Sequence, residues 1–344
     1  MTILGTPPPG DHDLPPSVTP ADGWFTVTTA TPEDWRPVEE WADGEGWNTG
    51  IGDMACFHAT DPGGFFLGRV GSRPVSAMSV VNYSPEYAFA GHYLVDPECR
   101  GRGHGLATWN AALPHAGART VGLDAAPARR SDYRRAGFTP AHDTIRYGGR
   151  PERSGRVAPD TVPVTLKHLA HPEHPGHSAR VRPPGPTGHA GRTGRPRTAR
   201  YSEHVENQAH LDAVAAYDRR FFPADRRGFL DRWLTAAGHV AYAALRDGRI
   251  TGYGVIRPAR EGHRVGPLLA GTRRDAEALF DSLTAHLGPD EEVFLDVPVP
   301  RGRADLLAAA RGLTERSHTV RMYRGPVPTA PAELAFATTT LELG

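Results

Sequence analysis

The clearest pattern in the chain is an apolar run, then a glycine-rich turn, then apolar residues at helical spacing. The segment YAFAGHYLV, residues 87–95, is rich in the aromatic and branched residues typical of a strand. After the turn, LATWNAAL, residues 106–113, combines good helix formers with apolar positions three and four residues apart. The pattern predicts a strand, a turn and a helix, so the glycines of the turn lie at the N-terminus of that helix.

The same succession of patterns occurs twice along the chain. The hairpin GRVGSRPVSAMSV at 68–80 has a counterpart in ALRDGRITGYGVI at 244–256, and VGLDAAP at 121–127 has one in VFLDVPVP at 293–300. A helix is expected after each of the latter two segments. The endings AGFTPAHDTIRYGG and RGLTERSHTVRMYRG then pair at one constant offset, which joins Gly137 to Gly312, Thr144 to Thr319 and Arg146 to Arg321. Because four segments keep their order, we expect one fold used twice.

Composition and charge are those of a soluble chain long enough for two domains of ordinary size. The 344 residues carry 39 Lys plus Arg and 39 Asp plus Glu, so the formal net charge of zero argues against a surface built for nucleic acid or acidic membranes. Two cysteines are too few for a disulfide framework or a cysteine zinc site. The chain shows no secretion signal and no apolar segment that would span a bilayer. We expect a cytoplasmic protein, and the preference for arginine over lysine suggests a bacterium with a GC-rich genome.

Composition also divides the chain into four segments. We expect a flexible lead-in at 1–21, a first domain at 22–149, a linker or insertion rich in Arg, Pro, Gly and His at 150–200, and a second domain at 201–344. Three-residue spacing brings four histidines of the linker within reach of one metal ion: His168, His171, His174 and His177. Histidine-rich linkers are more typically solvated, and we expect no metal.

The turn VDPECRGRGHGLA, residues 95–107, suits the binding of a phosphate. A helix N-terminus carries free N–H groups and the positive end of the helix dipole, and glycines let an anion reach those donors. The pattern GxxxxGK[ST] is excluded because the only lysine is Lys167, and GxGxxG is excluded because the glycines read GxGxG. The turn instead fits V-x-P-x-x-R-G-x-G-x-G, and in this it resembles the pyrophosphate loop of the GNAT superfamily of acyl-CoA N-acyltransferases.

This resemblance implies an α/β fold with a mixed sheet, two tandem GNAT-like folds, and acetyl-CoA as co-substrate. The pantetheine arm would lie along the strand before the turn and use main-chain groups of Tyr93, Leu94 and Val95. Arg100 would add charge or shape the turn, or else form a surface salt bridge. The pyrophosphate would be bound by main-chain N–H groups of five residues: Gly101, Arg102, Gly103, His104 and Gly105.

A second signature of the superfamily follows the next expected strand, where Tyr133 lies four residues before the Gly137–Phe138 pair. The resemblance implies that Tyr133 protonates the departing thiolate, and the alternative is a packing role. The superfamily also places a main-chain oxyanion donor near Val95.

The base that the superfamily often carries on the strand before the turn is missing, because its position holds Phe89. Asp124, His92 and Glu86 are the substitutes, acting through water. A structural role for Asp124 stays open, because Asp296 occupies the same place in the second copy.

The second copy lacks the features that would bind the cofactor. Its turn, GPLLAGTRRDAEALF, places Arg273 and Asp275 where the first copy has Gly103 and Gly105, and Ala308 stands in place of Tyr133. Side chains would block the main chain there, and a carboxylate would repel a phosphate. We therefore expect cofactor and catalysis in the first half, with the second half shaping the acceptor pocket.

The acceptor side is expected in EEWADGEGWNTGIGDMACF, residues 39–57, where Trp47, Asn48 and Asp53 are candidate substrate contacts, with Asp53 facing an ammonium group. The predicted function is an N-acetyltransferase of EC 2.3.1 type that acts on the primary amine of a small molecule by direct transfer in a ternary complex. Two alternatives stay open: an acyl-CoA sensor without turnover, and an acetyltransferase associated with a protein or nucleic acid. The sequence leaves the oligomeric state undetermined.

Overall fold

The structure is a computed structural model that describes residues 24–152, 155–164, 209–299, 304–329 and 334–344. The predicted lead-in at 1–21 lies outside the described residues, as do most of the 150–200 linker and its four histidines. Within the described ranges no three His, Cys, Asp or Glu side chains are arranged to hold a metal ion. No helix in this part of the chain is long and apolar enough to cross a membrane.

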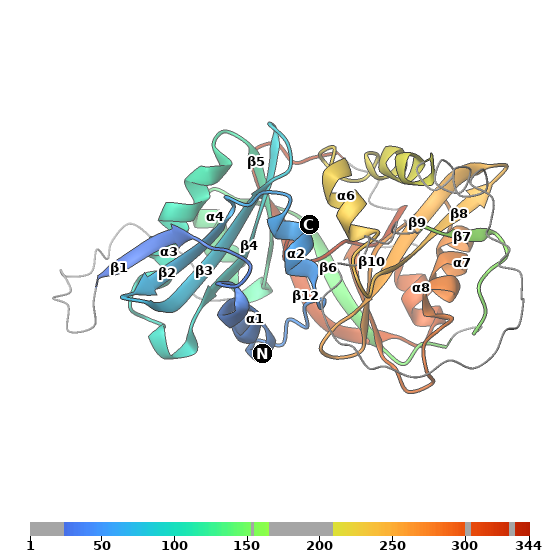
Figure 1. The fold of residues 1–344 in the computed structure, drawn as a ribbon, viewed down its shortest axis with the longest axis horizontal. Helices are drawn as coiled ribbons and strands as arrows, with labels where there is room; N and C mark the ends of the chain where they lie inside the picture. Colours follow the sequence, from blue (N-terminus) through green and yellow to red (C-terminus); the bar gives the residue numbers. More distant parts are fainter. Residues whose placement is uncertain (1–23, 153–154, 165–208, 300–303, 330–333) are drawn as a thin grey trace, which may run out of the picture.

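The first half forms one side of the molecule in Figure 1. Its strands are β1 (Phe25–Thr29), β2 (Phe65–Val70), β3 (Arg73–Asn82), β4 (Tyr87–Val95), β5 (Thr120–Ala125) and β6 (Thr139–Gly149). Its α-helices are α1 (Arg36–Gly44), α2 (Asp53–His58), α3 (His104–Ala112) and α4 (Arg130–Arg135). The predicted strand at 87–95 and the helix after the glycine turn are confirmed by β4 and α3.

The second half repeats this order of elements. Its strands are β7 (Thr161–Pro163), β8 (Val240–Arg246), β9 (Arg249–Pro258), β10 (His263–Ala270), β11 (Val293–Val299), β12 (Thr314–Arg324) and β13 (Ala335–Ala337). Its helices include α6 (Arg227–Trp233), α7 (Arg273–Thr284) and α8 (Ala304–Ala310), and residues 209–218 are also helical. The duplicated α/β fold predicted from the sequence is confirmed, since β9, β10, α7, β11, α8 and β12 follow the order of β3, β4, α3, β5, α4 and β6.

All described strands join in one mixed sheet in which the two halves exchange strands. The order is β1-β2-β3-β4-β5-β12-β6-β11-β10-β9-β8-β7, with β13 beside β10. Strand β12 of the second half pairs antiparallel with β5, and β6 of the first half pairs antiparallel with β11. The two exchanged strands also pair with each other, and they cross the centre of the molecule (Figure 1). Each half therefore completes the sheet of the other.

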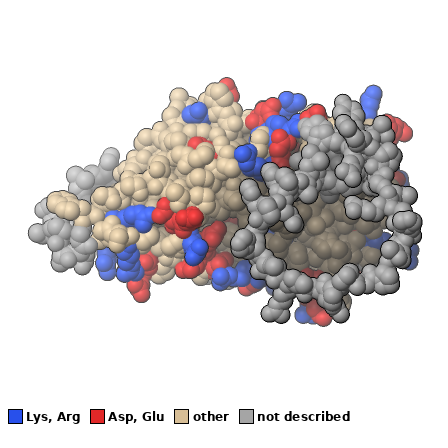
Figure 2. Space-filling view, viewed as in Figure 1, with Lys and Arg blue, Asp and Glu red and all other residues tan. Residues whose placement is uncertain are grey.

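Alternation along the strands places helices on both faces of the first half. Met78, Val80 and Tyr93 pack with α3 and α4 around Trp109, whereas Leu94 packs on the other face with α1 and α2. On the face shown in Figure 2, arginines and acidic residues are interspersed over the described part of the surface.

Candidate functional site

Strands β4 and β5 form a wedge in the first half. They pair in parallel only at Tyr87, Ala88 and Phe89, and beyond Phe89 no described strand pairs with β4 on the side that faces β5. Strand β5 pairs along its other edge with β12. We call the space between β4 and β5 beyond Phe89 the wedge. A strand with free main-chain groups on one edge is able to bind an extended ligand as an added strand.

A bulge in β4 lies inside the wedge. The register with β3 shifts between Ala77 and Ser79, and His92 in the bulge takes a φ of 44°, a value uncommon outside glycine. His92 is buried, and its Nδ1 lies 3.1 Å from Ser79 Oγ. Burial lowers the pKa of His92 to about 4, against the opposing charge of Glu342, so the imidazole is neutral at pH 7.

The glycine turn after β4 leads into α3 with no side chain on its N-terminus. Gly101 and Gly103 take φ values of 77° and 81°, and Gly103 is the N-cap of α3 without a side-chain hydrogen bond. Within the described residues, no hydrogen-bond acceptor is found for the N–H groups of Gly101, Gly103 or Gly105. The turn thus presents free donors at the positive end of a helix, as phosphate binding requires.

Two side chains shape this turn. Arg100 donates from Nε to the Val95 carbonyl at 3.2 Å and forms an ion pair with Glu45, so it both fixes the turn and makes the salt bridge considered above. A Cβ on Gly105 would lie 2.9 Å from Tyr93 Oη and from Val95 Cγ2, so only glycine lets α3 begin this close to β4. The Tyr93 hydroxyl is buried and has no partner among the described residues.

The equivalent helix of the second half is capped by its own side chains. Thr272 Oγ1 accepts a hydrogen bond from the Asp275 N–H at 3.1 Å, and the Asp275 carboxylate accepts from the Thr272 hydroxyl and from Arg246. Aligned by their N-caps, Gly103 of α3 corresponds to Thr272 of α7, one position from the expected Arg273. At least one donor at the start of α7, the Asp275 N–H, is therefore already satisfied, and a carboxylate lies beside it.

The wedge of the second half is filled by the chain itself. Strands β10 and β11 pair in parallel from His263 to Val265 and then diverge, like β4 and β5. Strand β13 enters the gap and pairs with β10 at Leu268 and Leu269. Directly after β13, the N–H of Thr338 donates to the Asp296 carbonyl of β11 at 2.9 Å. A ligand that adds to the edge of β10 is excluded here.

Tyr133 lies on α4 beneath α3. Its ring packs against Trp109 and Phe138, and the side chain is 3% exposed. Burial raises the pKa of the Tyr133 hydroxyl well above its usual value, so the phenol stays protonated. Both the packing and the proton-donor interpretations fit this placement.

Asp124 and Asp296 form equivalent ion pairs across the exchanged strands. Asp124 of β5 accepts from Arg321 of β12 at 3.0 and 2.7 Å, and Asp296 of β11 accepts from Arg146 of β6 at 2.6 and 3.1 Å. Burial raises the pKa of Asp124 while Arg321 opposes that shift. Because the pair recurs in both halves, its evident role is to hold the exchanged strands.

The three expected substrate contacts lie near the wedge, but two of them are engaged by the second half. Asn48 exchanges two hydrogen bonds of 2.9 Å with the main chain of Glu261, and Asp53 forms a bidentate ion pair with the buried Arg257 at 2.7 and 2.9 Å. Trp47 is buried, and its ring lies 6.2 Å from that of His92.

The candidate bases are also separated by the fold. Glu86 lies on the exposed turn before β4 and accepts a hydrogen bond from Ser84, at the opposite end of the strand from the wedge. Asp124 faces the wedge but is held by Arg321. His92 is the substitute whose ring stands in the wedge without a charged hydrogen-bond partner among the described residues.

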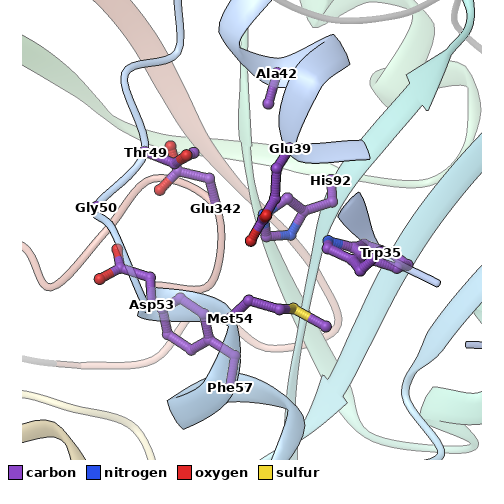
Figure 3. A pocket seen from close by; sticks show the side chains of 10 residues that line it. All are labelled: Trp35, Glu39, Ala42, Thr49, Gly50, Asp53, Met54, Phe57, His92 and Glu342. Atoms are coloured by element: carbon purple, nitrogen blue, oxygen red, sulfur yellow. The ribbon is translucent and has the colours of Figure 1, made fainter. Parts of the chain in front are cut away.

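Two cavities meet at the β4 bulge. The wedge cavity is lined by Gly46, Trp47, Gly91, His92, Asp124, Arg146, Ser317, Thr319, Leu341 and Glu342. The side cavity lies between α1, α2 and the bulge, and Figure 3 shows the side chains of Glu39, Asp53 and Glu342 around it. Partial burial raises the pKa of the Glu39 carboxyl group, although the residue remains exposed to solvent.

No sequence pattern indicated the site residues that come from the second half. Ser317, Thr319, Leu341 and Glu342 reach the wedge cavity only because β12 is exchanged and the segment 338–344 returns to the first half. The one signal in the sequence was the repetition of two positions, Arg146 with Arg321 and Asp124 with Asp296, which pair with each other in the structure.

Comparison with known proteins gives consistent results for the two halves. Residues 26–138 match the acetyltransferase (GNAT) family, and residues 214–337 match an acetyltransferase (GNAT) domain. A curated relative, holothin acyltransferase of Pseudoalteromonas sp. (strain SANK 73390), is 30% identical over 321 residues, which cover 93% of this chain and 95% of the relative.

Solved structures show the same fold over most of the chain. A Pyrococcus horikoshii protein assigned as an acetyltransferase has a TM-score of 0.67 and 18% identity, with 97% of this chain and 100% of that one covered. A tandem GNAT protein from the clavulanic acid biosynthesis pathway has a TM-score of 0.52 and 15% identity, with 89% and 100% covered. From the family matches and the curated relative, the chain belongs to the GNAT superfamily, as a tandem-domain, acyl-CoA-dependent acyltransferase.

Proposed function

We propose that this chain transfers an acetyl group from acetyl-CoA to a primary amine of a small molecule, in the first half and by direct transfer in a ternary complex. The observation that carries the proposal is the contrast between the two wedges. In the first half the wedge is open and its helix has free N–H donors, whereas in the second half β13 fills the wedge and α7 is capped by Thr272 and Asp275.

The residues of the first half fit coenzyme A. The free edge of β4 at Tyr93, Leu94 and Val95 would receive the pantetheine arm, which has peptide-like groups. The unpaired N–H groups of the turn would hold the pyrophosphate: Gly101, Arg102, Gly103, His104 and Gly105. Bound there, the thioester supplies the acyl group for transfer.

The transfer needs three contributions from the chain. As the C–N bond forms and the C–S bond breaks, a main-chain N–H near Val95 stabilises the oxyanion, and the Tyr133 hydroxyl gives its proton to the departing sulfur. The amine loses one proton to a base. We assign Asp124 to holding β12 rather than to this base, because its ion pair with Arg321 recurs as Asp296 with Arg146.

The acceptor would bind on the enclosed side of the wedge. The wedge cavity is bounded by Trp47 and His92 from the first half and by Thr319 from the second, and walls from both halves favour a small acceptor over a peptide. The curated relative acts on holothin, as its name states, and this supports a small-molecule acceptor here.

The test is release of free thiol from acetyl-CoA by the purified full chain with a panel of small primary amines that includes holothin. We expect amine-dependent release and an acetylated amine of the corresponding mass. Tight acetyl-CoA binding with no release for any amine would favour the sensor alternative. Release only with proteins or nucleic acids present would favour the macromolecular one.

A further inference from the structure

The wedge needs a carboxylate that β4 does not supply. Phe89 stands where a base is expected on that strand, and its ring is buried against Arg321. Asp124 lines the wedge cavity and Asp53 lines the side cavity, and each is held by two bonds from one arginine. Glu39, which also lines the side cavity, is exposed. A carboxylate for the acceptor must therefore come from elsewhere in the fold.

The segment 338–344 brings one from the second half. After β13 fills the second wedge, this segment crosses to the first half, where Tyr83 donates to the Leu343 carbonyl at 2.9 Å and Thr340 Oγ1 accepts from the Leu343 N–H at 3.0 Å. A Cβ on Gly91 would overlap the Glu342 carbonyl oxygen, so the segment packs directly on the β4 bulge. In Figure 1 the end of the chain lies at the centre of the molecule, between the halves.

Glu342 stands between the two cavities. Among the described residues, Glu342 and His92 are the two that line both the wedge cavity and the side cavity. Figure 3 shows both side chains at the side cavity. Glu342 is 5% exposed, and its one described hydrogen bond is a long one of 3.4 Å from Arg264 Nη1. Arg264 is itself shared with Asp296 and the Asn48 carbonyl, so Glu342 is the least neutralised buried carboxylate at this junction.

We propose that Glu342 binds the ammonium group of the acceptor and takes its proton, so that the second half completes the catalytic site of the first. One ammonium proton passes to a Glu342 carboxylate oxygen, and the freed electron pair of the nitrogen forms the C–N bond. The nitrogen then loses its second proton to solvent as the C–S bond breaks and the sulfur takes the proton of Tyr133. This inference rests on the proposed function. The charged and titratable groups facing Glu342 come from six elements: His92, Arg264, Asp124, Glu39, Asp53 and Arg146.

The test compares the full chain with Glu342→Gln, which keeps the side-chain shape and an acceptor for Arg264. At neutral pH we expect kcat to fall by a factor of about 100 or more, as for loss of a general base, with acetyl-CoA affinity changed by less than about twofold. The difference in kcat between wild type and Glu342→Gln should become smaller at high pH, because more of the amine is already neutral there. Glu315→Gln, an exposed change on β12, is the matched control and should keep wild-type kinetics.

A second variant and a binding measurement separate this inference from the proposed function. Gly91→Ala displaces the Glu342 main chain and should lower kcat in the same direction. Calorimetry with benzylamine in the presence of CoA should show at least about tenfold weaker binding to Glu342→Gln. Absence of acyl transfer by the wild-type chain would remove the proposed function, and this binding difference would still establish ammonium recognition. Equal benzylamine affinity, or an unchanged kcat and pH profile, overturns the role of Glu342.

Discussion

Arg321 of β12 and Asp124 of β5 form a buried bidentate ion pair that joins the two halves of the chain, and Arg146 with Asp296 repeats it in the opposite direction. The two pairs lie on the exchanged strands, beside the cavity in which the acceptor is proposed to bind. Burial raises the pKa of Asp296, but Arg146 and Arg264 outweigh it and lower that pKa to about 2. Asp124 and Arg146 therefore both join the exchanged strands and line the wedge cavity.

Arg321→Met should destabilise the chain by roughly 3 kcal/mol, because it leaves Asp124 buried without its partner. The double variant with Asp124→Asn should recover part of this loss, since no uncompensated charge then remains. Urea unfolding followed by circular dichroism measures both. A loss below about 1 kcal/mol in the single variant would show that the pair does not hold the strands.

Tyr133→Phe should lower kcat by a factor of about 100 while leaving acetyl-CoA affinity nearly unchanged, because the hydroxyl acts only on the departing thiolate. Phenylalanine keeps the contacts with Trp109 and Phe138, so stability should change little. Steady-state kinetics and calorimetry on the same preparation separate the two effects. Weaker cofactor binding with an unchanged kcat would assign Tyr133 to packing instead.

His92→Asn should remove part of the acid sensitivity of folding. The pKa of His92 is lowered by burial from 6.5 to about 4, so the unfolded chain binds more protons between these values and the free energy of unfolding falls as pH falls from 6.5 toward 4. The slope from one such group is at most about 1.4 kcal/mol per pH unit. Asparagine is chosen because it tolerates the positive φ at this position.

The measurement is the difference in unfolding free energy between wild type and His92→Asn across that pH range. Burial lowers the pKa of His142 and of His239 as well, but both residues are present in the two proteins, so their contributions cancel. A difference that does not vary with pH would mean that His92 is not held in its neutral form.

The repeated fold was predictable because its signals are local. Strand β4, the glycine turn and α3 follow from apolar spacing and from Gly101 and Gly103, and the constant offset from Arg146 to Arg321 revealed the duplication. The sequence indicated side chains in place of glycines at the start of α7, although Thr272 rather than Arg273 takes the N-cap position that corresponds to Gly103.

The strand exchange was not predictable from those signals. β6 and β12 would show the same alternation of apolar and polar residues whether they pair with strands of their own half or of the other half. Periodicity therefore does not distinguish the two arrangements. The place of Glu342 depends on that exchange and on the path of the segment after β13, both of which are long-range contacts.

The central claim is that one half alone binds the acyl donor, and calorimetric titration of the full chain with acetyl-CoA tests it most directly. We expect one molecule bound per chain and no binding to Gly103→Asp, which adds a negative charge and a side chain at a φ of 81°. Thr272→Ala at the corresponding N-cap of α7 should cost about 1 kcal/mol of stability and leave binding unchanged. No heat with the wild-type chain, or binding that survives Gly103→Asp and is lost with Thr272→Ala, would contradict the account.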